Sequence, residues 1–432
     1  MIWNETAECM DAEQRREMQS RRLRDTVARV YQNVEFYRKK MQELGIEPGD
    51  VKTIEDIVKL PFTTKKDLRE NYPFGLCAAP ESQFVRIHAS SGTTGKPTAV
   101  PYTRKDLDNF SECVARAICC TGGTNKDVIQ IAYGYGLFTG GLGLHDGATK
   151  LGAGVIPSSG GNTRNQLTLM KDFKSTILAC TPSYAMFLAE SLQEAGIRKE
   201  ELSLKIGIFG AEPWSNEMRK KIQEGLGLTA YDIYGLSEIM GPGVAASCAV
   251  QDGLHVAEDH FYPEILNPDT LEPVADGTVG ELVFTHLTKE AMPLLRYRTR
   301  DLSSIEHGSC ACGRTTAKMG RILGRSDDML IIRGVNVFPS QVESVLLEVA
   351  EVSPNYVIIV DRQGTMDTIE VKVELDERYV PDDLGDLERI KETIKHKLNS
   401  VLRIGVRVTL AEHKTIERSE GKAKRVVDRR HI

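Results

Sequence analysis

Residues 90–97 have the sequence Ser-Ser-Gly-Thr-Thr-Gly-Lys-Pro, the densest run of glycine and small polar residues in the chain. The run follows a strand-like segment at 84–88. Glycines let backbone N–H groups come close to an anion, and hydroxyls and a lysine add further donors. The run therefore suits a loop that holds phosphate groups. Ser/Thr/Gly clusters of this kind are, however, equally often flexible surface linkers.

The run differs from the P-loop of nucleoside triphosphatases. A P-loop has four residues between its first glycine and the Gly-Lys pair, and the Ser or Thr after the lysine binds magnesium. Here two residues separate Gly92 from Gly95, and Pro97 follows Lys96. The spacing therefore excludes a P-loop.

Two further segments combine glycine with groups that can bind a ligand. Residues 133–141, Tyr-Gly-Tyr-Gly-Leu-Phe-Thr-Gly-Gly, could line a flat pocket or simply turn the chain and fill a core. Residues 231–238, Tyr-Asp-Ile-Tyr-Gly-Leu-Ser-Glu, predict a strand that ends in a turn presenting Glu238. A carboxylate at a strand end can bind magnesium together with nucleotide phosphates, whereas most lone loop glutamates are only solvated.

The order of the predicted elements indicates an α/β protein. Strand-like runs alternate with helical segments, which favours parallel sheets covered by helices. The strand-like runs are 128–132, 176–180, 205–209 and 230–233. The helical segments are 105–120, 164–174, 183–195 and 215–226.

Past residue 325 the pattern predicts a small αββαβ domain. Its helices and strands are expected at 341–349, 356–361, 368–375, 383–402 and 406–411. The segment Gly-Arg-Ser-Asp-Asp at 324–328 marks the expected boundary. We therefore expect two domains, residues 1–325 and residues 326–432.

An amphipathic helix is predicted over residues 11–45. Its apolar residues alternate spacings of four and three, and Gly45 ends the pattern. They are Leu23, Val27, Val30, Val34, Tyr37, Met41 and Leu44. About three heptads favour a helix packed on its own domain, although a homodimer through the N-terminal region stays open.

Composition excludes several classes of protein. The 432 residues are 41% hydrophobic and 27% charged with a net charge of −6, which gives little attraction for nucleic acid. No apolar run approaches the roughly 18 residues of a membrane helix, and the first residues lack the features of a signal peptide. The nine scattered cysteines do not indicate a disulfide framework. We therefore expect a cytoplasmic protein that binds neither nucleic acid nor membranes.

Six motifs occur together in a characteristic order. They are Ser-Ser-Gly-Thr-Thr-Gly-Lys-Pro (90–97), Gly-Ala-Glu-Pro (210–213), Tyr-Gly-Leu-Ser-Glu (234–238), Tyr-Arg-Thr-Arg-Asp (297–301), Gly-Arg-Ser-Asp-Asp-Met-Leu-Ile-Ile-Arg-Gly-Val-Asn-Val-Phe-Pro (324–339) and Arg-Ser-Glu-Gly-Lys (418–422). With these motifs the chain resembles the adenylate-forming superfamily, and more closely the phenylacetate–coenzyme A ligase family. The resemblance implies the adenylate-forming fold, with a large N-terminal domain of α/β subdomains and a small, mobile α+β C-terminal domain.

The resemblance implies an acid–thiol ligase that uses ATP, Mg²⁺ and coenzyme A. A carboxylate attacks the α-phosphate of ATP, pyrophosphate leaves, and the thiol of coenzyme A then displaces AMP. The implied acid is phenylacetate or a related aryl acid, in phenylacetate catabolism, with indole-3-acetate and benzoate as competitors. A carrier-protein loader and a catalytically silent nucleotide-binding module are the alternatives, and the presence of Glu238, Asp301 and Lys422 argues against the latter.

The resemblance also implies which residues bind the nucleotide. The phosphates would lie against Ser90, Ser91, Gly92, Thr93, Thr94, Gly95 and Lys96. The adenine segment and the motif after it would comprise Gly210, Ala211, Glu212, Asp232, Tyr234 and Gly235. Glu238 matches the magnesium ligand, Asp301 matches the carboxylate that accepts both ribose hydroxyls, and Arg325 matches an arginine near ribose and phosphate.

Other residues match the moving parts and the acid pocket. Lys422 matches the mobile lysine that bridges the substrate carboxylate and the α-phosphate, with Asp327 as the hinge. The segment that begins at Gly334 matches the lining of the pantetheine tunnel. The position two residues later is Asn336, where many acyl-CoA synthetases have an arginine, so the role of that arginine is not transferred. Residues that could enclose an aromatic ring are Tyr135, Phe138, Ala211, Gly241 and Pro242.

Four residues could form a separate metal site. Cys310 and Cys312 lie on a turn that ends in glycine, and Cys248 and His255 stand about 60 residues earlier. Three thiolates and one imidazole would complete a tetrahedral zinc shell. The Cys-x-Cys spacing is tighter than usual, so a pair of free thiols beside a hydrogen-bonded histidine is the alternative.

Overall fold

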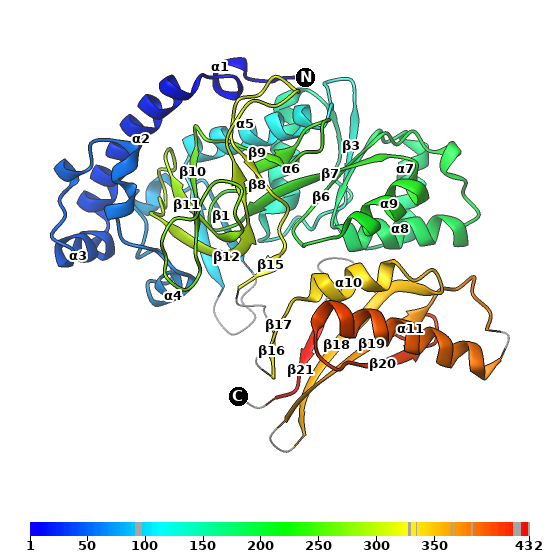
Figure 1. Ribbon diagram of the computed structural model, residues 1–432. Coiled ribbons are helices and arrows are strands. Elements are labelled where there is room, and N and C mark those ends of the chain that lie inside the picture. Colours follow the sequence, from blue (N-terminus) through cyan, green and yellow to red (C-terminus); the bar gives the residue numbers. More distant parts are fainter. Residues whose placement is uncertain are drawn as a thin grey trace. The chain divides into compact units, whose positions relative to one another are not determined.

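The computed structural model describes residues 1–90, 97–326, 330–333, 335–363, 366–381, 383–417 and 425–430. The chain forms two compact units (Figure 1). Unit 1 comprises Met1–Cys180, Leu202–Ala211 and Thr229–Ile322. Unit 2 comprises Thr181–Glu201, Glu212–Leu228 and Leu323–Ile432. The domain limits of 1–325 and 326–432 remain a prediction.

A nine-stranded mixed sheet lies at the centre of unit 1, in the order β13-β14-β9-β8-β7-β6-β5-β3-β4. The strands are β3 (Val128–Ile131), β4 (Gly154–Ile156), β5 (Ile177–Cys180), β6 (Ile206–Gly210), β7 (Thr229–Leu236), β8 (Gly241–Ser247), β9 (Leu254–Val256), β13 (Ile305–Glu306) and β14 (Lys318–Met319). The strands from β4 to β7 are parallel, and β8 pairs antiparallel with β7. The four predicted strands are confirmed, although β7 extends to Leu236.

Helices α5 (Arg104–Cys120) and α6 (Thr139–Leu151) pack against each other and against β8. The segment 133–141, for which the sequence left a pocket lining and a simple turn open, ends in the first turn of α6, a helix that the sequence did not predict. Glycine lowers helix propensity, which hid this helix in the sequence. A Cβ atom on Gly143 would lie 2.4 Å from the Phe110 ring, and one on Gly147 would lie 2.4 Å from Val114. The glycines therefore allow the two helices to approach closely.

The predicted N-terminal helix is two helices, α2 (Ala12–Asn33) and α3 (Glu35–Glu43), preceded by α1 (Glu5–Glu8). The break lies at Val34, whose backbone is extended. The apolar stripe from Leu23 to Met41 is buried in the core of unit 1, which confirms the predicted packing within one domain. Leu44 is an exception, because it is 56% exposed.

Smaller elements complete unit 1. Strands β1 (Arg86–Ser90) and β2 (Thr98–Tyr102) pair antiparallel on either side of the 91–96 segment. Strands β10 (Phe261–Leu266), β11 (Gly280–His286) and β12 (Tyr297–Ser303) form an antiparallel sheet in that order. The helices are α4 (Lys65–Glu70), α7 (Thr163–Asp172) and the 3₁₀ turns Pro48–Asp50, Ile54–Lys59 and Glu81–Gln83.

Unit 2 contains a four-stranded sheet in the order β20-β19-β18-β21. Its elements are α8 (Pro182–Glu194), the 3₁₀ turn Lys199–Glu201, α9 (Asn216–Leu226), β15 (Gly324–Arg325), β16 (Leu330–Ile332), β17 (Val335–Val337), α10 (Pro339–Leu347), β18 (Val352–Gln363), β19 (Met366–Leu375), α11 (Leu384–Leu402), β20 (Arg407–Ala411) and β21 (Val426–Asp428). The predicted αββαβ order is confirmed, and the β16–β17 hairpin and β21 are additions.

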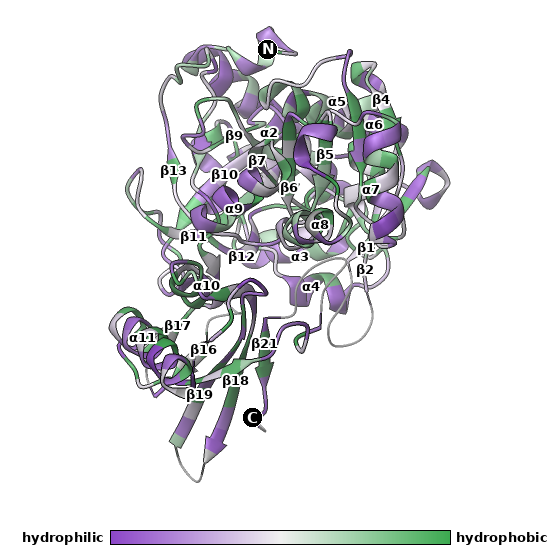
Figure 2. Cartoon of the chain, turned by 90° about the vertical axis from the view of Figure 1, so that its right-hand side faces the viewer, coloured by the Kyte–Doolittle hydropathy of each residue, from purple (hydrophilic) through white to green (hydrophobic). Residues whose placement is uncertain are grey.

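Helix α11 packs on this sheet through one apolar face. Ile390, Ile394, Leu398 and Leu402 recur every four residues and are buried with Ile358 of the sheet in one cluster. Hydrophobic and hydrophilic residues both appear along the helix in Figure 2, as expected for this periodicity. None of the helices in the described part of the chain combines the length and apolar character needed to cross a membrane.

Replacing Leu23 by alanine should destabilise the protein by about 2–5 kcal/mol, because a fully buried side chain leaves a cavity. Leu44→Ala is the matched control from the same predicted stripe, and it should change stability by at most about 0.5 kcal/mol. Urea unfolding followed by circular dichroism measures both. Equal effects of the two substitutions would contradict the assignment of Leu23 to the core.

Candidate functional site

The carboxyl ends of the parallel strands bring several predicted motifs to one edge of the large sheet. Strand β3 leads to Tyr133, β6 ends at Gly210, and β7 leads into the turn that carries Glu238. Open α/β sheets bind ligands at this edge, because the loops after the parallel strands meet there. The edge is therefore the candidate site.

Glu238 lies in this site with its carboxylate almost completely buried. The residue is 5% exposed, and its Oε1 accepts a hydrogen bond from Ser90 Oγ at 3.2 Å. Lys65 Nζ lies 3.9 Å from the same oxygen. Ser90 ends β1 and is the last described residue before the 91–96 segment. The structure thus joins two motifs that are almost 150 residues apart in sequence.

Buried donors hold the turn that carries Glu238. His286 Nε2 and Lys289 Nζ lie 2.5 Å and 3.3 Å from the carbonyl oxygen of Ile239. The hydroxyl of Tyr102 donates to the carbonyl of Met240 at 2.8 Å. Three side chains from β2, from β11 and from the loop after β11 therefore fix two successive carbonyls.

The protonation states of this clamp follow from burial. His286 is fully buried, which lowers its pKa to about 3 and keeps it neutral. Its Nδ1 accepts the N–H of Leu294 at 2.8 Å, so its Nε2–H is the donor to Ile239. Burial also lowers the pKa of Lys289 to about 8, and its ammonium lies 3.9 Å from the centre of the Tyr102 ring.

Two further carboxylates, those of Asp232 and Asp301, lie on β7 and β12. The hydroxyl of Tyr234 donates to Asp301 Oδ2 at 2.7 Å, and the Asp301 N–H donates to Thr299 Oγ1. Arg321 Nε lies 3.3 Å from Asp232 Oδ2. The contacts place Tyr234 and Asp301, which come from two different motifs, side by side.

Two glycines in the motifs have no room for a side chain. A Cβ atom on Gly210 would lie 2.1 Å from the carbonyl oxygen of Ile233, and one on Gly235 would lie 1.7 Å from that of Gly241. Ala211 follows Gly210 with a φ of +73°, a conformation that few non-glycine residues adopt. The backbone of strands β6, β7 and β8 is therefore packed tightly at the site.

The residues predicted for the acid pocket gather around the start of α6. Phe138 immediately precedes the helix and is 41% exposed, and Tyr135 contacts His145 of the helix edge-to-face at 6.0 Å between ring centres. A Cβ atom on Gly241 would lie against Thr139, and one on Gly143 would lie against Pro242. Tyr133 donates to the carbonyl of Gly210, next to Ala211, at 3.3 Å.

The remaining predicted residues fall into two groups. Glu212 and Arg325 belong to unit 2, where Glu212 Oε1 accepts the N–H of Ser183 at 2.7 Å. Nine predicted residues fall outside the described part of the chain, namely Ser91, Gly92, Thr93, Thr94, Gly95, Lys96, Asp327, Gly334 and Lys422. Their roles remain predictions.

The sequence reasoning missed four residues around Glu238, namely Lys65, Tyr102, His286 and Lys289. Each stands outside the six motifs, and only the fold brings them to the Glu238 turn. A possible signal was the polarity of His286, Lys289 and their neighbours, which stand between two apolar strand segments. This polarity does not indicate which residues they contact.

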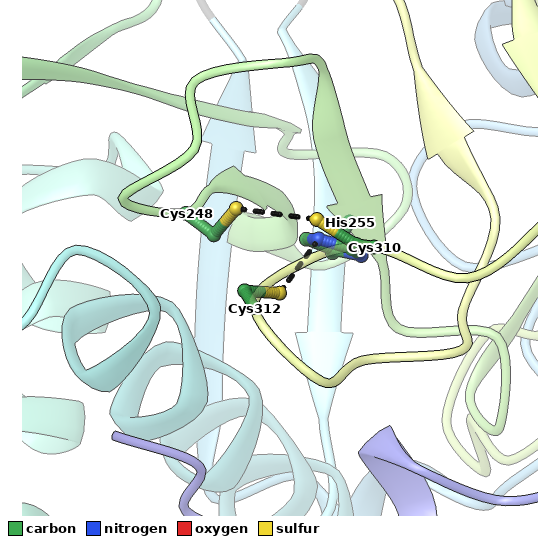
Figure 3. A group of neighbouring side chains, drawn as sticks. All are labelled: Cys248, His255, Cys310 and Cys312. Carbon is green, nitrogen blue, oxygen red and sulfur yellow. Dashed lines mark hydrogen bonds between the residues drawn. The ribbon is translucent and has the colours of Figure 1, made fainter.

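The four residues predicted for a metal site converge at the other end of β8 (Figure 3). Cys248 follows β8, His255 lies on β9, and Cys310 and Cys312 lie on the loop between β13 and β14. All four candidate ligand atoms lie within 4.8 Å of one another. Cys248 Sγ is 3.8 Å from Cys310 Sγ, and Cys312 Sγ is 3.4 Å from His255 Nε2.

The surroundings orient this cluster. His255 Nδ1 and Thr316 Oγ1 are hydrogen-bonded at 3.1 Å, so Nε2 faces the sulfur atoms. Burial raises the pKa of Cys248 to about 11, and burial together with nearby Arg314 lowers the pKa of His255 to about 4. Gly313 has a φ of +93°, which lets the chain turn sharply after Cys312.

Comparisons with known proteins agree with the fold. The family model described as AMP-binding enzyme matches residues 12–287, and that described as AMP-binding enzyme C-terminal domain matches residues 334–430. A phenylacetate-coenzyme A ligase from Thermus thermophilus is 49% identical over all of both chains. One from Escherichia coli is 51% identical, over 96% of this chain and 95% of the relative.

A solved structure is also similar. It is a 2-hydroxyisobutyryl-CoA ligase in the postadenylation state, with a TM-score of 0.93 and 29% identity over 98% of this chain and 92% of that one. The family models and this similarity confirm the predicted adenylate-forming fold, with its large N-terminal and small C-terminal parts.

Replacing Gly235 by alanine should destabilise the protein by about 1–3 kcal/mol, because the new methyl group must displace the backbone of β8. Gly49→Ala is the control, since a Cβ atom there would meet nothing within 4 Å. The free energy of unfolding in urea measures both changes. Native stability in the Gly235 variant would contradict the tight β7–β8 approach.

Proposed function

The chain belongs to the phenylacetate–coenzyme A ligase family of AMP-binding enzymes, and from this membership we propose that it joins phenylacetate to coenzyme A. An AMP-forming acid–CoA ligase makes an acyl-adenylate and pyrophosphate from the acid and ATP, and then a thioester and AMP. The observation that carries the proposal is the convergence of Ser90, Glu238, Tyr234 and Asp301 at the carboxyl edge of the sheet.

The proposed roles follow from the chemistry of these groups. Glu238 would hold Mg²⁺ with the phosphates of ATP, because Mg²⁺ is commonly bound by one or two carboxylates together with substrate phosphates. Asp301 would accept the ribose hydroxyls, with Tyr234 fixing the orientation of its carboxylate through the bond to Oδ2. Gly210 and Ala211 would border the adenine, as the family pattern implies, with the backbone of Gly210 held close to Ile233 of β7.

The adenylation step needs positioning and charge neutralisation rather than a covalent nucleophile. The acid attacks phosphorus, negative charge grows on the departing pyrophosphate, and preorganised cations stabilise it. The metal ion supplies Lewis-acid stabilisation of that charge when it is bound. Lys422, Asp327 and Gly334 would contribute the bridging lysine, the hinge and the pantetheine tunnel, as the family pattern implies.

Phenylacetate is the acid that the first turn of α6 suits. Tyr135, Phe138 and Pro242 gather there, and Phe138 is 41% exposed. Flat apolar walls favour an aryl ring over a straight chain. Indole-3-acetate and benzoate are the acids against which the preference should be measured.

The decisive experiment measures pyrophosphate release across phenylacetate, indole-3-acetate, benzoate and acetate, with and without coenzyme A. Phenylacetate should have the highest kcat/KM, and phenylacetyl-CoA should form only when coenzyme A is present. Glu238→Gln should lower kcat/KM by at least about 100-fold, as expected when a charged ligand for the metal is lost. Release without a thioester would favour a carrier-protein loader, and no release with any acid would overturn the ligase proposal.

We also propose that Cys248, His255, Cys310 and Cys312 hold a structural Zn²⁺. Tetrahedral zinc with Zn–S bonds of about 2.3 Å keeps its sulfur ligands about 3.8 Å apart, the separation of Cys248 and Cys310. The hydrogen bond of His255 Nδ1 to Thr316 leaves Nε2 for the metal, the usual arrangement around a zinc-bound histidine. Four protein ligands close the shell, so the metal would stabilise the fold rather than catalyse.

Metal analysis of the protein purified under reducing conditions should find about one zinc per chain. Cys310→Ser should reduce this to near zero and lower the melting temperature, because the four-ligand shell loses a thiolate. Cys77→Ser is the control, since that free cysteine lies outside the cluster. Less than about 0.2 zinc per chain in the wild-type protein would reject the site.

A further inference from the structure

Lys65 lies at the candidate nucleotide site although no motif includes it. It is the first residue of α4, and its Nζ is 3.9 Å from Glu238 Oε1, the oxygen that also accepts the hydrogen bond from Ser90. The side chain of Lys65 is 34% exposed, whereas that of Glu238 is 7% exposed. The partly exposed ammonium group of Lys65 therefore lies beside the buried carboxylate of Glu238.

The backbone before Lys65 is fixed to the strand that carries Asp301. Thr63 forms a parallel bridge with Tyr297 of β12, through hydrogen bonds of 3.2 Å to the Arg296 carbonyl and 2.9 Å from the Arg298 N–H. Thr63 is fully buried, and its hydroxyl donates to the carbonyl of Leu295. The position of Lys65 is therefore set by the same strand that positions the proposed ribose ligand.

The start of α4 directs Lys65 toward the site. Thr64 caps the helix, and Asp67 accepts the Thr64 N–H at 2.7 Å while its other oxygen lies 3.2 Å from Lys40. Asp67, an acidic residue of the same helix, is therefore already paired with Lys40. Lys66 points elsewhere, with an 80% exposed side chain 3.6 Å from Glu70.

Lys289, a second lysine near Glu238 in the described part of the chain, is buried and cannot reach a ligand. It is 1% exposed, covers the Tyr102 ring and donates to the Ile239 carbonyl. It therefore supports the turn from inside the core, and of these two lysines Lys65 has the more exposed side chain. Lys65 is placed to supply a cation to a phosphate group, because its ammonium is a compact point charge on a flexible four-carbon stem.

We propose that Lys65 is a phosphate-binding cation of the ATP site that contacts the β- and γ-phosphates. The proposal rests on the proposed function and extends it to a residue outside the motifs of the family. When Mg²⁺ and ATP occupy Glu238, the ammonium of Lys65 transfers from the carboxylate to the phosphate oxygens. There it offsets the charge that develops on pyrophosphate as it leaves.

The first test compares Lys65→Met with Lys66→Met in the full-length protein. Calorimetry should show that Lys65→Met weakens the binding of pyrophosphate and of ATP about tenfold in buffer with saturating Mg²⁺ and no acid, because one charge-assisted contact is lost. Lys66→Met should bind as the wild type does. Lys65→Arg should recover most of the affinity. Unchanged binding in Lys65→Met would overturn the proposal.

The second test separates a phosphate ligand from a simple counter-ion of Glu238. Lys65→Met should raise the KM for ATP in adenylation and leave thioester formation from added phenylacetyl-adenylate unchanged, because that intermediate lacks the β- and γ-phosphates. If Lys65 only neutralised Glu238, its removal would instead lower the Mg²⁺ concentration needed for half-maximal rate without altering ATP binding. That result would overturn the proposal.

Failure of the proposed function would look different. A wild-type protein that releases no pyrophosphate with any acid would refute the ligase activity. The binding comparison between Lys65→Met and Lys66→Met would still decide whether Lys65 contacts phosphate, because it needs no acid and no turnover.

Discussion

The clamp on the turn between β7 and β8 is the constraint on which the candidate site depends. Two successive carbonyls, of Ile239 and Met240, accept hydrogen bonds from buried side chains that come from distant parts of the sequence. Each donor is almost completely buried, so leaving one carbonyl unpaired would cost about 1–3 kcal/mol. This cost holds the backbone of the turn in one conformation, and Glu238 is presented from it toward Ser90 and Lys65.

Strand β8, which follows this turn, connects the candidate active site with the metal cluster. Strand β8 begins at Gly241, against the first turn of α6, and Cys248 follows its last residue. A zinc ion bound by Cys248, His255, Cys310 and Cys312 would tie β8 and β9 to the loop between β13 and β14. The antiparallel side of the sheet would then be cross-linked by metal, in addition to the packing of β8 against α5 and α6. In this view the metal stabilises the strand that supports the Glu238 turn.

The sequence predicted the features that depend on a short-range residue pattern. It missed the features that depend on close contact between segments far apart in the chain. The strands at 128–132 and 205–209 were found from apolar runs, and the cluster of Cys248, His255, Cys310 and Cys312 was found from ligand type. Helix α6 was missed because its glycines disfavour a helix in isolation, and only contact with α5 explains them. Lys65 and Lys289 were missed because a lone lysine has no spacing signal, and their roles come entirely from the fold.

The central claim is that the clamped turn presents Glu238 as the metal ligand of the ATP site. The most direct test is a crystal structure with Mn²⁺ and a nonhydrolysable ATP analogue, in which anomalous scattering locates the metal. The account predicts an anomalous peak about 2.0–2.2 Å from a carboxylate oxygen of Glu238 and in contact with the phosphates. A metal bound to the phosphates but away from Glu238 would contradict it.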